Sequence, residues 1–253
     1  MTEPEPPAEP VAWEGDDTPR SARFGDVYYA GRDGPSESAH VFLAGNGLPD
    51  RFAAMAPGTT FRIGELGFGT GLNFLVTLSA WRASAGRRGP DTRLRFTSFE
   101  RFPMQETDRH RALTVWPEIA VLWPAWGMCI DRRQGWQHHV IDDVELRLAI
   151  GDAAALVPTM RDNVDAWYLD GFSPARNPAL WSAALMRDVA ARTAAGGTIA
   201  TFTAAGWVRR NLAAARFEVT RSAGFGRKRH MTQGFLLSAI AADTSCQTAH
   251  GSA

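Results

Sequence analysis

Four acidic residues stand at the ends of strand-like segments, and glycines alternate along the loop that follows the first of them. Glu65 precedes the loop at 67–71, and Glu100, Asp152 and Asp170 stand at or just after the ends of three later apolar segments. Such carboxylates can bind hydroxyl or amino groups or accept a proton, and glycine lets a ligand approach the backbone closely. The pattern predicts a nucleotide-like ligand beside a proton acceptor, at one edge of a sheet.

The spacing of the glycines narrows the choice of ligand. It is G-x-G-x-G at 67–71, whereas the dinucleotide fingerprint G-x-G-x-x-G packs a pyrophosphate against a helix N-terminus. Glu65 would repel a pyrophosphate but suits a cation, so we expect S-adenosylmethionine as the cofactor. An ordinary glycine-rich turn between a strand and a helix is the alternative. The candidate cofactor-binding residues are Glu65, Gly67, Phe68, Gly69, Thr70, Gly71, Asn73, Glu100, Asp152 and Asp170.

The three later acids have separate expected roles. We expect Glu100 to accept hydrogen bonds from ribose hydroxyls and Asp152 to accept the adenine amino group. Asp152 is equally well placed to cap a helix that starts at Ala153, and both roles can hold together. Asp170 is the candidate catalytic residue, holding an amine nucleophile and accepting its proton. The alternative for Asp170 is a tight turn in which its carboxylate binds backbone amides.

The segments that must position these residues alternate between strands and helices. Strands are expected at 61–66, 94–99, 144–150, 164–169, 198–203, 217–221 and 231–239, with 138–141 forming a hairpin with the third. Helices are expected at 72–83, 106–115, 178–193 and 206–215, the third being stopped by Gly196 and Gly197. This order predicts an α/β, Rossmann-like fold of the class I S-adenosylmethionine-dependent methyltransferase type. Its sheet should be twisted and mostly parallel, with helices on both faces.

Length and composition suit one large domain, since the chain has 253 residues, 45% of them hydrophobic and 21% charged. We expect an acidic, proline-rich disordered tail at 1–20, a methyltransferase domain with an N-terminal extension at 21–242, and a flexible tail at 243–253.

No apolar run is long enough to span a membrane, and the acidic start is unlike a targeting peptide. A soluble, cytoplasmic protein is therefore expected. Cys129 and Cys246 lie outside any Cys/His pattern, so no metal is expected.

Charge is unevenly distributed along the chain. The formal net charge is zero, yet six acidic residues precede the first basic residue, Arg20. Between Ala205 and His230 there are seven basic residues and one acid, Glu218. Such a basic patch gathers phosphates, although a solvated helix face and loop would have the same composition.

Several motifs, in their order along the chain, resemble the MnmC/MnmD methyltransferases. They lie at 64–75, 169–178, 201–210 and 224–229, with two more at 25–29 and 41–46, so the resemblance runs from about 24 to 239. The resemblance implies methylation of the exocyclic amine of 5-aminomethyl-2-thiouridine at the tRNA wobble position, giving the 5-methylaminomethyl product. A methyltransferase for a small-molecule or protein amine, and a non-catalytic or NAD-binding module, are the alternatives.

The resemblance also implies partners and substrate contacts. The partner is the anticodon region of tRNA, and the candidate substrate-binding residues are Phe172, Pro174, Arg176, Asn177, Arg209, Arg227, Lys228 and Arg229. Many family members carry a C-terminal FAD-dependent oxidase, and no second glycine motif follows here, so we expect that activity, if needed, to come from a separate protein. Ser173, Arg176 and His230 depart from the family, where Ala, Lys and an acid are common at these positions.

Overall fold

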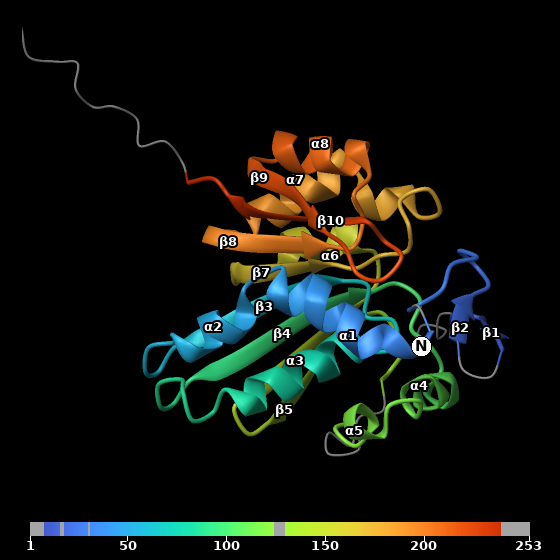
Figure 1. Cartoon of the computed structure of the whole chain (residues 1–253), viewed down its shortest axis with the longest axis horizontal. Helices are drawn as coiled ribbons and strands as arrows, with labels where there is room; N and C mark the ends of the chain where they lie inside the picture. The colour runs from blue at the N-terminus through green and yellow to red at the C-terminus, as the bar shows by residue number, and fades with distance from the viewer. Residues whose placement is uncertain (1–7, 16–17, 30, 124–129, 239–253) are drawn as a thin grey trace, which may run out of the picture.

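A computed structural model describes residues 8–15, 18–29, 31–123 and 130–238, and its centre is an eight-stranded sheet (Figure 1). The strand order is β5-β6-β4-β3-β7-β8-β10-β9. Five adjacent strands are parallel: β6 (Val144–Ile150), β4 (Arg93–Glu100), β3 (Thr60–Leu66), β7 (Val164–Leu169) and β8 (Thr193–Thr201). Three strands complete the edges through antiparallel pairing: β5 (Gly135–Ile141), β10 (His230–Leu236) and β9 (Phe217–Ala223). The α/β fold with a mostly parallel sheet is confirmed.

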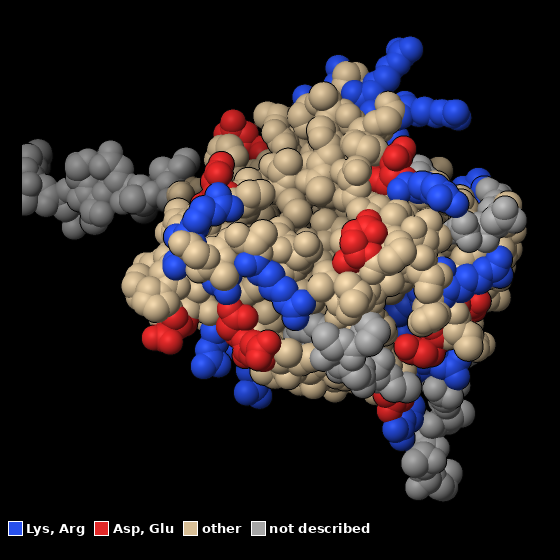
Figure 2. All heavy atoms as spheres, turned by 60° about the horizontal axis from the view of Figure 1, so that its bottom comes forward, with Lys and Arg blue, Asp and Glu red and all other residues tan. Residues whose placement is uncertain are grey.

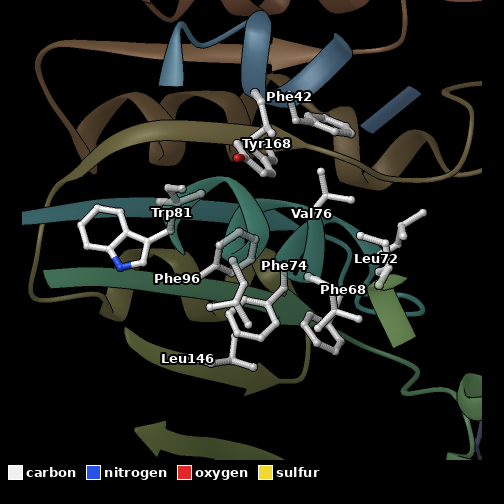
Figure 3. Packing of buried hydrophobic residues seen from close by; sticks show 14 of the residues in the cluster. Phe42, Phe68, Leu72, Phe74, Val76, Trp81, Phe96, Leu146 and Tyr168 are labelled. Atoms are coloured by element: carbon white, nitrogen blue, oxygen red, sulfur yellow. The ribbon is translucent and has the colours of Figure 1, made fainter. Parts of the chain in front are cut away.

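One face of the sheet is covered by α1 (Gly34–Ser38), the π-helical η2 (Ala39–Ala44), α2 (Leu48–Ala53) and α3 (Leu72–Ala83). Figure 3 shows Phe74 of α3 and Phe96 of β4 facing each other, with ring centroids 5.4 Å apart in an edge-to-face arrangement. Both side chains are fully buried. The strand β3 is likewise buried on both sides over its last four residues, because a parallel sheet between two helical layers has no solvent-facing side.

The opposite face is covered by α6 (Ala153–Leu156), η4 (Val157–Thr159), η5 (Pro178–Trp181), α7 (Ala183–Ala191) and α8 (Gly206–Ala214). A second apolar cluster forms there around Trp167, Trp181 and Val208. Ser182 caps α7 by accepting a hydrogen bond from the backbone N–H of Leu185 at 3.3 Å. The two clusters fix the sheet between them and hold the ends of its strands in place.

The single helix expected at 178–193 is wrong in detail. Pro178 starts a short 3-10 helix, and α7 begins separately after the cap at Ser182. Gly196 and Gly197 do not stop the helix, because they lie inside β8. The pairing of β7 with β8 shifts register between Val164 and Ala166, and Gly196 has a φ of +70°. These glycines therefore serve an irregular strand start, the other common use of glycine in a strand-like pattern.

The disordered tail expected at 1–20 is also wrong for the residues there that the structure describes. A hairpin of β1 (Val11–Glu14) and β2 (Thr18–Ser21) lies beyond the carboxyl ends of the parallel strands, near α4 (Glu106–Leu113) and α5 (Pro117–Ala120) (Figure 1). Glu9 is only 2% exposed. Its carboxylate accepts a hydrogen bond from Ser21 and pairs with Arg23 at 3.2 Å. Because the buried Glu9 carboxylate has polar partners, it can be buried without a large desolvation penalty, and this acidic segment can fold. Residues 1–7, 16–17 and 243–253 lie outside the described residues.

Candidate functional site

A cavity of about 540 Å³ opens at the carboxyl ends of β3, β4, β6 and β7. It lies where the sheet order reverses, with β4 on one side of β3 and β7 on the other. In open α/β sheets ligands bind at this switch point, outside the strand ends. The lining includes the predicted residues Gly67, Phe68, Gly69, Thr70, Asn73, Glu100, Asp152 and Asp170. Eight of the ten cofactor-binding candidates thus meet at one cavity.

The glycine loop follows β3 and forms a backbone wall of this cavity. Gly67 has a φ of +92°, and its N–H donates to the carbonyl of Phe99 at 2.9 Å. A Cβ atom on Gly67 would collide with the backbone carbonyl of Asp170. Gly69 has a φ of +53°, and a Cβ there would lie 3.0 Å from the ring of Tyr28. A side chain would collide at Gly67 and be strained at Gly69, and the bare backbone is suited to close approach by a ligand such as S-adenosylmethionine.

Glu100 is the last residue of β4, and its carboxylate binds the backbone of the glycine loop. One carboxylate oxygen accepts from the N–H of Gly69 at 3.0 Å, and the other accepts from the N–H of Phe102 at 2.8 Å. Burial raises the pKa of Glu100, and the backbone hydrogen bonds oppose that rise. Each oxygen keeps a second lone pair, so the carboxylate can still accept a hydrogen bond from a ligand hydroxyl.

Asp152 follows β6 and occupies the capping position that was left open as an alternative. Its side chain accepts from the N–H of Ala154 at 3.0 Å, and its other oxygen pairs with Arg101 at 3.1 Å. Asp152 also lines the cavity. The helix cap is therefore present, in a position that leaves the residue beside the ligand space.

Asp170, Asn73 and Glu65 form a hydrogen-bonded network at the bottom of the cavity. The Asn73 side-chain NH2 group donates to Asp170 at 2.6 Å and to Glu65 at 3.0 Å. The carbonyl oxygen of Asn73 accepts from the hydroxyl of Ser38 at 2.6 Å, which fixes the amide orientation. Asn73 is therefore a shared donor between two carboxyl groups from neighbouring strands.

Burial shifts the pKa of Asp170 in a direction that suits proton transfer. Burial raises the pKa of Asp170 from 3.8 to about 7, while the Asn73 hydrogen bond and the charge of Lys228 oppose the rise. A carboxyl group with a pKa near neutrality exchanges a proton more readily at physiological pH than an ordinary aspartate. The backbone N–H of Asp170 meanwhile donates to the carbonyl of Leu66 at 3.1 Å, which keeps the residue in the sheet.

Glu65 differs from its expected role as a direct ligand contact. Its side chain is fully buried, and among the described residues it is not part of the cavity lining. It accepts from Ser98 at 2.6 Å as well as from Asn73, and burial raises its pKa well above the ordinary value. Glu65 thus lies behind the loop and orients Asn73. Gly71 also lies outside the lining and starts α3 with a φ of +81°.

The segment 24–28 covers one end of the cavity, a contact that the sequence alone did not predict. Phe24 stacks on Phe172 at a centroid distance of 4.8 Å, and Tyr28 meets the same ring edge-on at 5.1 Å. The Asp26 carboxylate accepts from the N–H of Ser173 at 2.8 Å. The motif at 25–29 is one of those that resemble the MnmC/MnmD methyltransferases, but its residue types alone did not indicate this contact. One ring face of Phe172, a candidate substrate-binding residue, is covered by Phe24.

The candidate substrate residues divide into two groups. Phe172, Asn177 and Lys228 line the cavity. Pro174 is buried, and Arg176 donates to the carbonyl of Phe24 at 3.2 Å, so both shape the closing segment. Arg209, Arg227 and Arg229 lie outside the lining, among the residues described. In the view of Figure 2, basic side chains are spread around the periphery with acidic ones between them.

Comparison with known proteins places this site in a family. Residues 119–236 match the S-adenosyl-L-methionine-dependent methyltransferase family Methyltransf_30. The chain is 45% identical over 227 residues to the tRNA 5-methylaminomethyl-2-thiouridine biosynthesis bifunctional protein MnmC of Ectopseudomonas mendocina, covering 88% of this chain and 34% of the relative. The chain therefore carries a Methyltransf_30 domain of the S-adenosylmethionine-dependent methyltransferase type, and its curated homologues are MnmC proteins. It spans about a third of the length of the relatives that it matches.

Two further comparisons agree with this family. MnmC of Chromobacterium violaceum is 42% identical over 233 residues, which cover 89% of this chain and 34% of the relative. The crystal structure of MNMC2 from Aquifex aeolicus has a TM-score of 0.69 at 23% identity, covering 94% of this chain and 73% of that chain. At that identity the likeness supports the class I methyltransferase fold alone.

No helix within the described ranges combines the length and apolar character needed to cross a membrane. In the same part of the chain, no three histidine, cysteine, aspartate or glutamate side chains are grouped so as to hold a metal ion.

Proposed function

We propose that this methyltransferase acts on the exocyclic amine of 5-aminomethyl-2-thiouridine at the wobble position of tRNA. The observation that carries the proposal is Asp170, a carboxyl group with a pKa near 7 that faces a cavity beside the glycine loop. The MnmC relatives are named for the biosynthesis of 5-methylaminomethyl-2-thiouridine in tRNA, which supports this amine as the acceptor.

The cavity provides a place for the cofactor. Gly67, Gly69 and Thr70 would hold S-adenosylmethionine against the loop backbone, with Glu100 and Asp152 accepting hydrogen bonds from it. When bound, the cofactor supplies a methyl group activated by a sulfonium. The acids that surround the cavity favour a cationic ligand over a phosphate-containing one.

Asp170 supplies the proton route. An amine attacks only when it is uncharged, so a proton must leave it before or during transfer. The Asp170 carboxylate accepts that proton, and the Asn73 amide holds the carboxylate in place at 2.6 Å. Phe24, Asp26 and Tyr28 contact the loop after Asp170 and line this end of the cavity, where they would help to orient a bound substrate.

The basic residues outside the cavity support an RNA substrate. Arg209 is on α8, while Arg227 and Arg229 are exposed between β9 and β10. Guanidinium groups pair well with phosphates. A tRNA substrate would place the enzyme in the cytoplasm, and the aminomethyl group would be supplied by a separate protein, including any FAD-dependent oxidase that is needed.

The test is incubation of the full chain with S-adenosylmethionine and tRNA that carries 5-aminomethyl-2-thiouridine, followed by nucleoside mass analysis. We expect the aminomethyl nucleoside to be converted to its methylaminomethyl form. Reversing the charge of Arg227 and Arg229 should reduce tRNA methylation while S-adenosylhomocysteine binding stays unchanged. Methylation of free amines or proteins without methylation of tRNA would contradict the proposal and favour the alternative substrates.

A further inference from the structure

Lys228 is the only lysine in the chain, and its ammonium group lies in a defined polar and aromatic environment. The Lys228 Nζ atom is 2.7 Å from a carboxylate oxygen of Glu37 and 4.4 Å from the ring centroid of Phe202. All three residues line the cavity that also contains Asp170. A carboxylate beside an aromatic face is a typical binding environment for an ammonium ion.

The two groups that hold this ammonium come from well-anchored parts of the fold. Glu37 is on α1, and its side chain is 13% exposed. The next residue, Ser38, donates to Asn73, which in turn donates to Asp170. Phe202 follows β8, and Trp181 packs edge-on against its ring at 6.2 Å. The helix segment that carries Glu37 and the Phe202 ring are therefore held by contacts that do not involve Lys228.

Lys228 itself is held more loosely. Its side chain is 45% exposed, and it belongs to the loop between β9 and β10, where Arg227 and Arg229 flank it. The lysine end of this ion pair is in contact with water, so the ammonium can leave Glu37 without becoming a buried, unpaired charge. A phosphate beside the flanking arginines would offer its ammonium another partner.

We propose that Glu37 and Phe202 form a recognition subsite for the primary ammonium of the methyl acceptor, and that Lys228 occupies this subsite until the substrate displaces it. The lysine side chain ends in the same functional group as the aminomethyl substrate, a primary ammonium on a flexible carbon. The identity of that substrate rests on the proposed function. Glu37 positions the incoming ammonium, and Asp170, in the same cavity, accepts its proton and leaves a neutral amine.

The test measures binding of n-butylammonium chloride by ligand-observed NMR, with 1-butanol as the uncharged comparison. The proteins are the wild type, Lys228→Ala, Lys228→Ala combined with Glu37→Gln, and Arg227→Ala as a control for loss of charge on the same loop. We expect Lys228→Ala to bind butylammonium at least tenfold more tightly than the wild type and to prefer it to butanol. The double variant should lose that gain, and Arg227→Ala should match the wild type. S-adenosylhomocysteine binding verifies that each variant is folded.

Other outcomes overturn the subsite. If Lys228→Ala binds neither probe, binds both equally, or keeps its ammonium affinity with Glu37→Gln, the subsite does not exist. A second measurement uses the aminomethyl tRNA, for which Glu37→Gln should raise KM at least fivefold with a smaller change in kcat. Failure of the wild type to methylate tRNA, together with ammonium binding by Lys228→Ala, would refute the proposed function and leave the subsite in place.

Discussion

Replacing Asp170 by asparagine separates its roles in proton transfer and in stability. The asparagine oxygen can still accept the Asn73 hydrogen bond, which is 2.6 Å long in the native protein, so the local geometry should persist. The change removes the capacity to accept a proton. We therefore expect S-adenosylhomocysteine affinity to stay within about threefold and kcat to fall by about 100-fold or more, the usual contribution of a general base.

The same variant should be more stable than the wild type at high pH. Burial raises the pKa of Asp170 from 3.8 to about 7, which corresponds to about 4 kcal/mol, or about 2–4 kcal/mol once contact with cavity water is allowed for. Because the folded-state pKa is raised, the stability that protonated Asp170 contributes is fully present below pH 3.8 and is lost as pH rises through about 7. Asparagine stays neutral throughout, so its advantage grows with pH.

Urea denaturation at pH 5.5 and pH 8.5 measures this difference. The gain in unfolding free energy of Asp170→Asn should be larger at pH 8.5 by about 1–2 kcal/mol. The matched control for turnover is Asp165→Asn on β7, the strand that Asp170 follows; its carboxylate accepts from the backbone N–H of Arg62 at 2.7 Å, outside the cavity lining. Asp165→Asn should retain near wild-type turnover. A pH-independent gain, or near-normal turnover of Asp170→Asn, would refute the reasoning.

Three further predictions test the surroundings of Asp170. Gly67→Ala should destabilise the fold by about 1–3 kcal/mol and weaken S-adenosylhomocysteine binding, because the new Cβ collides with the Asp170 carbonyl and the residue has a positive φ. Thermal denaturation measures the loss, with Gly86→Ala as the control because the Cβ position there is open. Equal melting temperatures of the two variants would contradict the prediction. Asn73→Ala should shift the rise of kcat with pH to higher pH, since the Asn73 hydrogen bond lowers the pKa of Asp170; a pH–rate profile measures the shift, and a shift to lower pH would disprove it. Glu9→Ala should destabilise the protein by about 1–3 kcal/mol by leaving Arg23 and Ser21 without their buried acceptor; a midpoint in urea equal to that of the wild type would rule out the structural role of Glu9.

The sequence alone was sufficient to predict the parallel core and eight residues that the structure brings together in the lining of the cavity. Strand and helix periodicities are local, and parallel strands place their carboxyl ends at one edge, so acids at strand ends such as Glu100 and Asp170 had to converge. The glycine loop was also visible in the sequence, because glycine adopts the positive φ found at Gly67 and Gly69 more readily than any other residue.

Tertiary structure alone decided how the cavity is closed and which polar groups face it. Asp26 and Ser173 are 147 residues apart in sequence, and no local sequence pattern predicts that the Asp26 carboxylate accepts a hydrogen bond from the Ser173 backbone N–H. The fold also turned Glu65 inward toward Asn73, and placed Lys228 against Glu37 on α1 while its two arginine neighbours stayed outside the cavity lining. Residue type and spacing determine which elements form, whereas the direction in which a charged side chain points depends on the partners that packing brings to it.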